Sequence, residues 1–330
     1  MKYLYCVIPD NKLQTFDIQG IGGEIFTIPY EDISLVVSDS KPIPFATLRK
    51  DELVNYLLRH QSIIEKVMQN YSVVPLKFGT FIDGDNETQR IMKKGYKLFK
   101  EIMETLSGKI ELDLVGIWNE MNGVLKEIGE IAEIQCFKDE VTQKPPGERI
   151  QGGIILGKMV KDFLDRKKDR IAEEIITALS ASGGQAGAFC KHATLNDRMI
   201  FNTAFLLDKD KKEVFEQELA ELDRKYEGKI NFKCVGPLPP YSFATIEIKK
   251  LTPDEIFYAK AVLGIVEDPP PEEVKRAYRA MAGKLHPDKN PDNPEAAKQF
   301  VELKKAFDLL YEYTSNGCDL FSVKKLTLPT

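Results

Sequence analysis

The sequence predicts an α+β protein with two small α/β-sandwich-like lobes, followed by an all-α helical hairpin. The first observation is a strand–turn–helix–strand order at residues 72–118, and the second is the same order at residues 199–235. Such alternation favours ferredoxin-like β-α-β elements. The third observation is a pair of apolar stripes of helical period, which begin at Val274 and Phe300 and flank a polar loop. Two amphipathic helices joined in this way are expected to pack as an antiparallel hairpin.

Length and composition limit the classes of function that fit this chain. At 330 residues it is long enough for two or three domains with real cores. The net charge of −5 and the absence of arginine-rich tracts argue against a nucleic-acid partner. No run of apolar residues is long enough to predict a membrane span. Five scattered cysteines, an odd number, are typical of reduced thiols, so we expect a cytoplasmic protein.

The first lobe is expected to occupy residues 1–120. Its strands are predicted at 2–8, 24–28, 33–37, 72–81 and 109–118. One long helix or two are predicted at 50–71, and a further helix at 87–106. The strand at 109–118 is expected to complete a β-α-β unit with the strand and helix before it. His60 lies on the first helix, where a lone histidine is more often packed or solvated than catalytic.

The second lobe is expected at residues 153–248, after a helical or linker region at 121–152 that contains Lys144-Pro145-Pro146-Gly147. A long helix from about Gly153 to Ala181 should end at the glycine-rich run 183–187. A strand at 199–207, a helix at 212–226 and a strand at 229–235 follow. The lobe closes with GPLPPYSF, residues 236–243, whose prolines stiffen the backbone. This run is interpreted either as a rigid exit with Tyr241 and Phe243 pinned on the core, or as a docking surface.

The C-terminal hairpin carries the most informative motif of the chain. Val274, Ala277, Tyr278, Met281, Ala282 and Leu285 form one apolar helix face. The other face carries the basic residues Lys275, Arg276, Arg279 and Lys284. His286-Pro287-Asp288 then ends the helix, because proline lacks an N–H and disfavours helical geometry in the residue before it. Gly283 in the last turn costs about 1 kcal/mol relative to alanine and is expected to weaken that turn.

This hairpin resembles the J-domain of DnaJ-type co-chaperones, with a short leading helix at AKAVLG, residues 259–264. The resemblance places a J-domain at residues 249–313 and a tail at 314–330. It implies that His286, Pro287, Asp288 and the four basic residues contact a DnaK-type chaperone and trigger its ATP hydrolysis. Within the tail, residues 324–328 are interpreted either as a final strand returning to a lobe or as a loose end.

A second resemblance covers residues 1–248. MKYLYCVIP at 1–9, VPLKFGT at 74–80, with Pro75, Phe78 and Gly79, and above all GPLPPYSF resemble the GvpF/GvpL family of gas vesicle proteins. In the GPLPPYSF run the matching residues are Gly236, Pro237, Pro239, Pro240, Tyr241, Ser242 and Phe243. Around Gly152-Gly153-Ile154-Ile155 the sequence departs from the family's Gly-x-x-Tyr-Leu pattern. The family implies a two-lobed protein that associates with the apolar GvpA-type shell subunit and other gas vesicle accessory proteins.

These resemblances lead to one function and two alternatives. We expect a gas vesicle assembly protein that binds the shell subunit and recruits a DnaK-type chaperone. The alternatives are a generic J-domain co-chaperone with an unrelated client-binding front half, and a structural shell-lining component whose hairpin does not stimulate a chaperone. No enzyme and no cofactor are expected. Cys190 and His192 lack a second ligand pair at metal-site spacing, and they are poorly placed as nucleophile and base.

Overall fold

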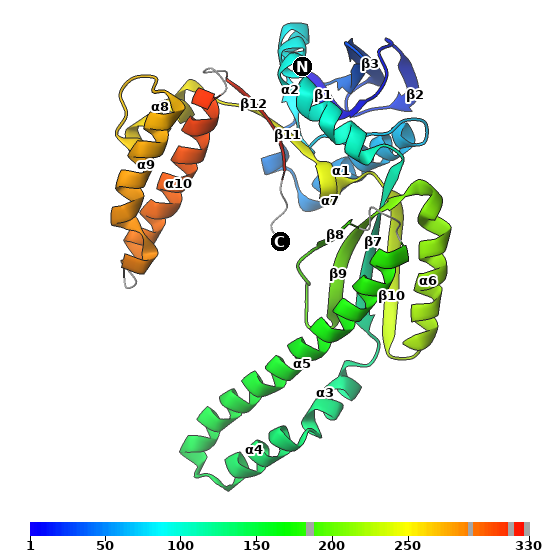
Figure 1. Ribbon diagram of the computed structural model, residues 1–330, viewed down its shortest axis with the longest axis vertical. Coiled ribbons are helices and arrows are strands. Elements are labelled where there is room, and N and C mark those ends of the chain that lie inside the picture. Colours follow the sequence, from blue (N-terminus) through cyan, green and yellow to red (C-terminus); the bar gives the residue numbers. More distant parts are fainter. Residues whose placement is uncertain (183–187, 290–292, 316–319, 327–330) are drawn as a thin grey trace. The chain divides into compact units, whose positions relative to one another are not determined.

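The structure is a computed structural model that describes residues 1–182, 188–289, 293–315 and 320–326 (Figure 1). The described residues form two compact units. The first contains Met1–Ile63, Leu76–Glu101 and Ile246–Leu326, and the second contains Ile64–Pro75 and Ile102–Thr245. Each unit is therefore assembled from segments that are far apart in the sequence.

The first unit is built on an antiparallel sheet in the order β2-β3-β4-β1, with β6 also paired to β1. Its strands are β1 (Lys2–Ile8), β2 (Thr15–Gln19), β3 (Glu24–Tyr30), β4 (Ile33–Asp39) and β6 (Phe81–Ile82). A short 3-10 turn, η1 (Phe45–Thr47), precedes helix α1 (Lys50–Met68), and helix α2 (Gly84–Leu106) follows β6. Every residue of β1 after Lys2 is buried, as expected for a central strand covered on both faces.

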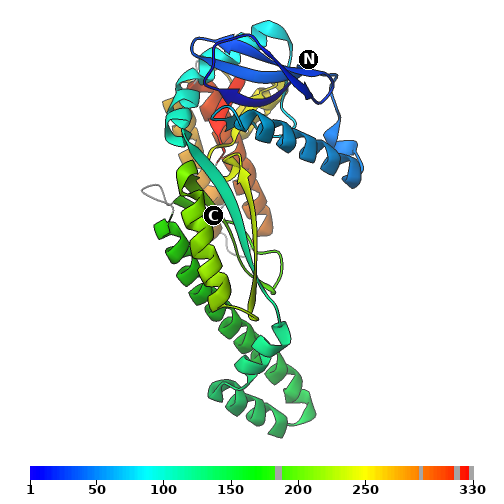
Figure 2. The same ribbon diagram turned by 90° about the vertical axis from the view of Figure 1, so that its right-hand side faces the viewer.

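The second unit holds an antiparallel sheet in the order β10-β7-β9-β8. Its strands are β7 (Lys109–Trp118), β8 (Ala188–Lys191), β9 (Met199–Asp208) and β10 (Ile230–Leu238), and the two-residue strand β5 (Val74–Pro75) also belongs to this unit. Helices α5 (Pro146–Ser182) and α6 (Lys212–Lys225), the latter preceded by η2 (Lys209–Lys211), lie on one face of the sheet (Figure 2). Leu112, Phe205, Ile175 and Phe215 form part of the shared core.

Strand β7 corrects the sequence prediction. It was expected to complete a β-α-β unit of the first lobe, but it lies at the centre of the second sheet, where Leu112 pairs with Phe205 and Cys234 faces Leu114. Its alternating burial fits this place, because one face of the strand meets the helices. Strand pairing depends on partners about a hundred residues away, and no local pattern encodes it.

The region expected as a helical or linker segment is helical, with α3 (Met121–Gly129) and α4 (Ala132–Gln143) beside the first half of α5. Helix α5 begins at Pro146 rather than Gly153, with proline near the helix start, where its missing N–H costs nothing. Its 37 residues give a length of about 55 Å. A side chain at Gly152 would approach Val141 of α4 to 2.7 Å, so Gly152 permits close packing of the two helices. The expected helix end at 183–187 lies outside the described residues.

The C-terminal part of the first unit is a three-helix group framed by two strands. Strand β11 (Ile246–Lys250) leads into α8 (Pro253–Leu263), α9 (Pro271–Leu285), the 3-10 turn η3 (Pro287–Lys289) and α10 (Pro294–Ser315), and β12 (Phe321–Lys325) follows. Ile256, Leu263, Val274, Leu303 and Leu310 form the centre of its core. Thr252 and Glu255 form a reciprocal capping box at the start of α8, and Gly264 ends that helix in a left-handed conformation.

The predicted fold class is confirmed: two α+β lobes precede a helical hairpin. Helices α9 and α10 occupy the positions that the two apolar stripes predicted. The prediction of one strand over residues 72–81 was wrong, since only β5 and the first residue of β6 are extended there. Residues 321–325 form a strand, which contains Lys324 and Lys325 of the predicted final strand, and residues 327–330 lie outside the described residues.

Candidate functional site

At the tip of the C-terminal hairpin, local contacts hold the His286 imidazole, and the Asp288 carboxylate is exposed to solvent. Helix α9 ends at Leu285, and Nδ1 of His286 accepts a hydrogen bond from the backbone N–H of Asp288 at 3.2 Å. The imidazole also meets the Phe300 ring of α10 edge-on, at 5.4 Å between centroids. The Asp288 side chain is 88% exposed, and its carboxylate lies 3.5 Å from Nδ1 of His286. The tip is therefore ordered by local contacts, and its negative charge faces solvent.

The four basic residues of the predicted face differ in their exposure and local contacts. Arg276, Arg279 and Lys284 are exposed along α9. Lys275 instead lies at the edge of the helix interface, where its ammonium pairs with Glu272 at 2.8 Å and lies 5.1 Å from the centre of the Tyr311 ring. The Glu272 carboxylate raises the pKa of Lys275. Arg276 also has an acidic partner on the same helix, Glu273 at 3.8 Å.

The last turn of α9 remains helical through Gly283. The ammonium of Lys289, directly after the tripeptide, donates to the carbonyl oxygen of Gly283 at 3.0 Å. A cation at the C-terminal end of a helix is stabilised by the unpaired carbonyl groups there. Lys289 and Phe300 thus support the tip, a role that the sequence analysis assigned to neither residue. Their signal was available in the position of Lys289 next to the tripeptide, and of Phe300 at the head of the second stripe.

The VPLKFGT motif supports the first sheet from inside. The backbone N–H of Gly79 donates to the Tyr3 hydroxyl at 3.1 Å, and Gly79 has a φ of +81°. The ring of Phe78 meets those of Tyr3 and His60 at 6.5 and 5.6 Å. Pro75 lies in the buried strand β5. Burial lowers the pKa of His60 to about 4, so this histidine is a neutral core residue, as its position on an apolar helix suggested.

The GPLPPYSF motif forms the end of β10 and the short helix α7 (Tyr241–Ala244). Gly236 has a φ of +144°, and a side chain there would approach Leu112 of β7 to 2.6 Å. Its bond to Pro237 is cis. Beyond Leu238, the carbonyl oxygen of Pro239 accepts from the N–H of Tyr241, and that of Pro240 accepts from the N–H groups of Phe243 and Ala244. The motif is therefore a tight turn that permits close packing against β7.

Ser242 anchors this turn to the centre of the second sheet. Its backbone N–H donates to one carboxylate oxygen of Glu111 at 2.9 Å, and its hydroxyl donates to the other at 2.7 Å. Nε2 of His192 lies 3.1 Å from the same hydroxyl oxygen. Glu111 on β7 is 1% exposed, and this burial raises its pKa. Asp113, its neighbour on the same face, also has a raised pKa because of burial.

The hydrogen bonds of this polar cluster hold the GPLPPYSF motif against strand β7. The Ser242 hydroxyl lies 2.7 Å from a side-chain oxygen of Glu111 and 3.1 Å from Nε2 of His192, so it is shared between two inward contacts. Burial also raises the pKa of Cys190, the opposite of what a reactive thiolate requires. Within the described residues, no group of three or more His, Cys, Asp or Glu side chains gathers as a metal site. The motif is thus held inward by long-range hydrogen bonds.

Known proteins match the chain in two separate regions, the α+β lobes and the C-terminal helices. A model of the gas vesicle synthesis protein GvpL/GvpF family matches residues 1–245. The chain belongs to this family. Gas vesicle protein F of Nostoc sp. is 20% identical over 248 residues, covering 74% of this chain and 98% of the relative. Gas vesicle protein F1 of Halobacterium salinarum is 23% identical over 251 residues, covering 74% and 93%.

Solved structures share the fold of this GvpL/GvpF region. The crystal structure of the gas vesicle protein GvpF from Anabaena sp. matches with a TM-score of 0.64 at 18% identity, covering 74% of this chain and 98% of that one. The GvpF structure from Microcystis aeruginosa matches with a TM-score of 0.59 at 21% identity, with the same coverage. Both resemblances drawn from the sequence are confirmed, and these matches confirm the one to the GvpF/GvpL family.

The resemblance to the J-domain is confirmed by a DnaJ domain model that matches residues 258–315. The chaperone protein DnaJ of Oleidesulfovibrio alaskensis is 53% identical over 49 residues, which are 15% of this chain and only 13% of that protein. DnaJ homolog subfamily C member 5 of Tetronarce californica is 49% identical over 56 residues, 17% of this chain and 29% of the relative. The GvpL/GvpF protein thus carries a J-domain, which indicates association with a chaperone. In the described part of the chain, no helix combines the length and the apolar character needed to cross a membrane.

Proposed function

We propose that this protein assists gas vesicle assembly in the cytoplasm by binding the shell subunit and recruiting a DnaK-type chaperone to it through the J-domain. The observation that carries the proposal is the presence, in one chain, of a GvpL/GvpF region and an ordered His-Pro-Asp tip beside an exposed basic helix face. The J-domain relatives support a chaperone as partner. The proposed role is one of binding, without catalysis by the protein itself.

The physical advantage of the fusion is local concentration. A shell subunit apolar enough to form a gas-facing wall exposes aggregation-prone surface before it assembles. A J-domain in the same chain brings the chaperone close to a shell subunit bound by that chain. Such a local encounter is often worth a factor of roughly 10² to 10⁴ in effective affinity without new contacts. The exposed guanidinium groups of Arg276 and Arg279 favour an acidic surface on the chaperone.

The proposal is tested by the ATPase turnover of a DnaK-type chaperone in the presence of the full chain. The wild-type protein should stimulate turnover, and Asp288→Asn should abolish most of that effect. A lost charge-assisted hydrogen bond is worth roughly 1.5–3 kcal/mol, which corresponds to about a 10- to 100-fold loss. Asp308→Asn is the matched control, because Asp308 is an exposed carboxylate on α10 that pairs only locally with Lys304 at 2.8 Å. Absence of stimulation by the wild-type protein would contradict chaperone recruitment.

A pulldown with the shell subunit separates the alternatives. The proposed assembly protein retains the shell subunit in both the wild-type and the Asp288→Asn form. A generic J-domain co-chaperone would stimulate the ATPase without retaining the subunit. A structural shell-lining component would also retain the subunit, but Asp288→Asn would leave vesicle formation unchanged.

A further inference from the structure

The residues that join the J-domain to the GvpL/GvpF region form a structure of their own. Strands β11 and β12 pair in antiparallel register from Ile246 with Lys325 to Lys250 with Phe321. The backbone N–H of Leu251 extends this pairing with a 2.7 Å hydrogen bond to Leu320. Both strands lie outside residues 1–245 and 258–315, the ranges matched by the two family models. The two ends of the J-domain are thus tied together by residues that neither family accounts for.

Strand β11 and the Phe321 ring attach this ladder to the GvpL/GvpF region. Leu76 and Ile246 form a parallel bridge, and the N–H of Lys77 donates to the carbonyl oxygen of Ile246 at 2.8 Å. Phe321 is 2% exposed, and the guanidinium of Arg90 on α2 lies 5.3 Å from the centre of its ring. Lys94 of the same helix donates to the carbonyl oxygen of Phe321. Two cations of α2 therefore hold β12 in place, Arg90 through the Phe321 ring and Lys94 through the carbonyl oxygen of the same residue.

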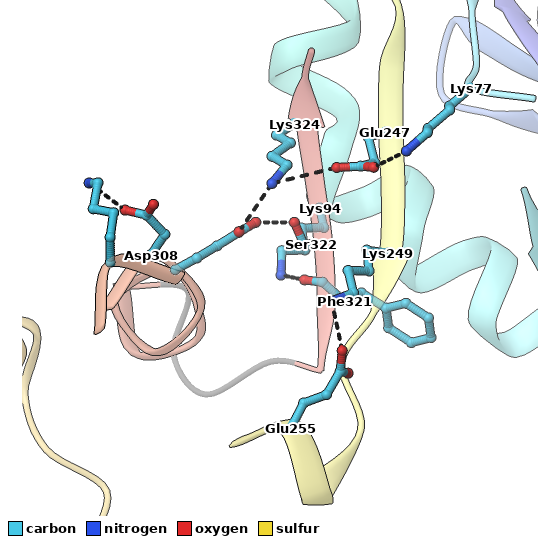
Figure 3. Close-up of polar contacts among 11 residues, drawn as sticks. Lys77, Lys94, Glu247, Lys249, Glu255, Asp308, Phe321, Ser322 and Lys324 are labelled. Atoms are coloured by element: carbon cyan, nitrogen blue, oxygen red, sulfur yellow. Dashed lines mark hydrogen bonds and ion pairs between the residues drawn. The ribbon is translucent and has the colours of Figure 1, made fainter. Parts of the chain in front are cut away.

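A chain of alternating charges runs from the GvpL/GvpF side to the J-domain (Figure 3). Lys77 pairs with Glu247 of β11 at 2.6 Å, and Glu247 also faces Lys324 of β12 at 3.5 Å. Lys324 in turn lies 3.9 Å from Glu312 of α10, whose carboxylate also accepts from the Ser322 hydroxyl. A network of several charges is worth more than an isolated exposed pair. Glu247, at its centre, is only 18% exposed in its side chain.

A second polar link binds the other end of the J-domain. Lys249 of β11 pairs with Glu255 at 2.8 Å, and Glu255 is also the capping-box carboxylate of α8. Leu251 is buried in the J-domain core. Both the first and the last helix of the J-domain are consequently connected to the ladder, α8 through Glu255 and α10 through Glu312.

We propose that the β11–β12 ladder with Phe321 and Lys324, here called the clasp, holds the J-domain in one fixed orientation on the first lobe. Phe321 and Lys324 are positioning residues: they do not contact a chaperone themselves but set the direction in which the His-Pro-Asp tip points. A single flexible connection would leave that direction free, whereas two paired strands with side-chain contacts on both sides restrict it. The value of this orientation for vesicle assembly rests on the proposed function, but the clasp itself does not.

The first test measures backbone amide relaxation in the full-length protein, which reports how fast each part rotates. In the wild-type protein, the amides of α8–α10 should relax at the rate of those in β1 and β4. Phe321→Ala, and separately a deletion of residues 320–330, should shorten the rotational correlation time of the α8–α10 amides, so that their transverse relaxation slows, and should leave β1 and β4 unchanged. Phe321→Leu keeps much of the apolar volume without the ring and should give an intermediate rate. Independent rotation of the wild-type J-domain, or wild-type rotation in both loosened variants, would overturn the proposal.

The second test separates positioning from damage to the J-domain. Phe321→Ala should stimulate a DnaK-type ATPase in solution as well as the wild-type protein, because its tip is intact, but should lower the yield of gas vesicles. Loss of ATPase stimulation to the level of Asp288→Asn, or an undiminished vesicle yield despite independent rotation, would overturn the positioning role. A wild-type protein that rotates as one body but stimulates no ATPase would instead refute the proposed function and leave the clasp standing.

Discussion

The J-domain and the GvpL/GvpF region place their characteristic residues in opposite ways. In the J-domain, His286 and Asp288 are two positions apart and Lys289 binds Gly283, and the charged groups face solvent. In the GvpL/GvpF region, Ser242 binds Glu111 across 131 positions, and Gly79 binds Tyr3 across 76. The first pattern leaves charged groups exposed to solvent, while the second uses polar groups to hold distant parts of the fold together. The family motifs of the larger region are therefore poor candidates for its contact surface.

The largest effect is expected from Gly236→Ala, which tests the inward role of the GPLPPYSF motif. The φ of +144° disfavours any side chain, and the new Cβ would lie 2.8 Å from the Glu111 carbonyl oxygen. Strain and overpacking together should lower the free energy of unfolding by about 3–5 kcal/mol. Urea denaturation of the full chain measures this loss. Gly228→Ala is the matched control, since Gly228 has a φ of +73° but open space around it, and it should cost no more than about 2 kcal/mol. Equal losses for the two variants would show that the close approach to β7 is unimportant.

A smaller, pH-dependent effect is expected from His60 in the first lobe. Its pKa in the folded protein is about 4, below its usual 6.5, because burial disfavours the charged imidazole. The unfolded chain therefore binds the extra proton first on acidification, and stability is constant above pH 6.5 and falls as the pH drops toward 4. Between pH 7.5 and pH 5 the loss should be about 2 kcal/mol. Amide exchange of β1 at the two pH values measures it.

His60→Asn is the matched variant for that experiment, because its side-chain amide can still bond to the Tyr3 hydroxyl, which lies 3.0 Å from Nδ1 of His60. In this variant the difference between the two pH values should shrink by the same 2 kcal/mol or so. A pH dependence that persists undiminished would assign it to carboxylates elsewhere in the lobe.

The smallest effect is expected in the J-domain, from Thr252→Ala. The variant removes the hydroxyl that accepts from the N–H of Glu255 at 3.2 Å, and with it one half of the capping box. The cost should be about 1 kcal/mol in the stability of α8. Amide exchange within α8 reports it directly. Thr142→Ala, which removes a hydroxyl bond to Asp139 on the exposed helix α4, should change stability by less than about 0.5 kcal/mol. A Thr252→Ala variant as stable as this control would mean that the rest of the core fixes α8 by itself.

The same contrast explains which features the sequence could predict. The J-domain helices follow from local periodicity, and the hairpin tip follows from Pro287 and the polar loop beside it. The pairing of β7 with β9 could not be foreseen, since it depends on residues nearly a hundred positions away. Helices α3 and α4 were partly concealed by Pro145, Pro146 and the glycines around them. Ser242 was identified within a motif, but its partner Glu111 carries no local signal that distinguishes it from the many surface acids.

The pairing of Lys250 with Phe321 has one more consequence. Because these two positions face each other, a hairpin turn of a few residues would suffice to connect them. We therefore expect that a variant in which such a turn replaces the helices α8–α10 would still pair β11 with β12. The strands that carry the J-domain would then form a plain β-hairpin.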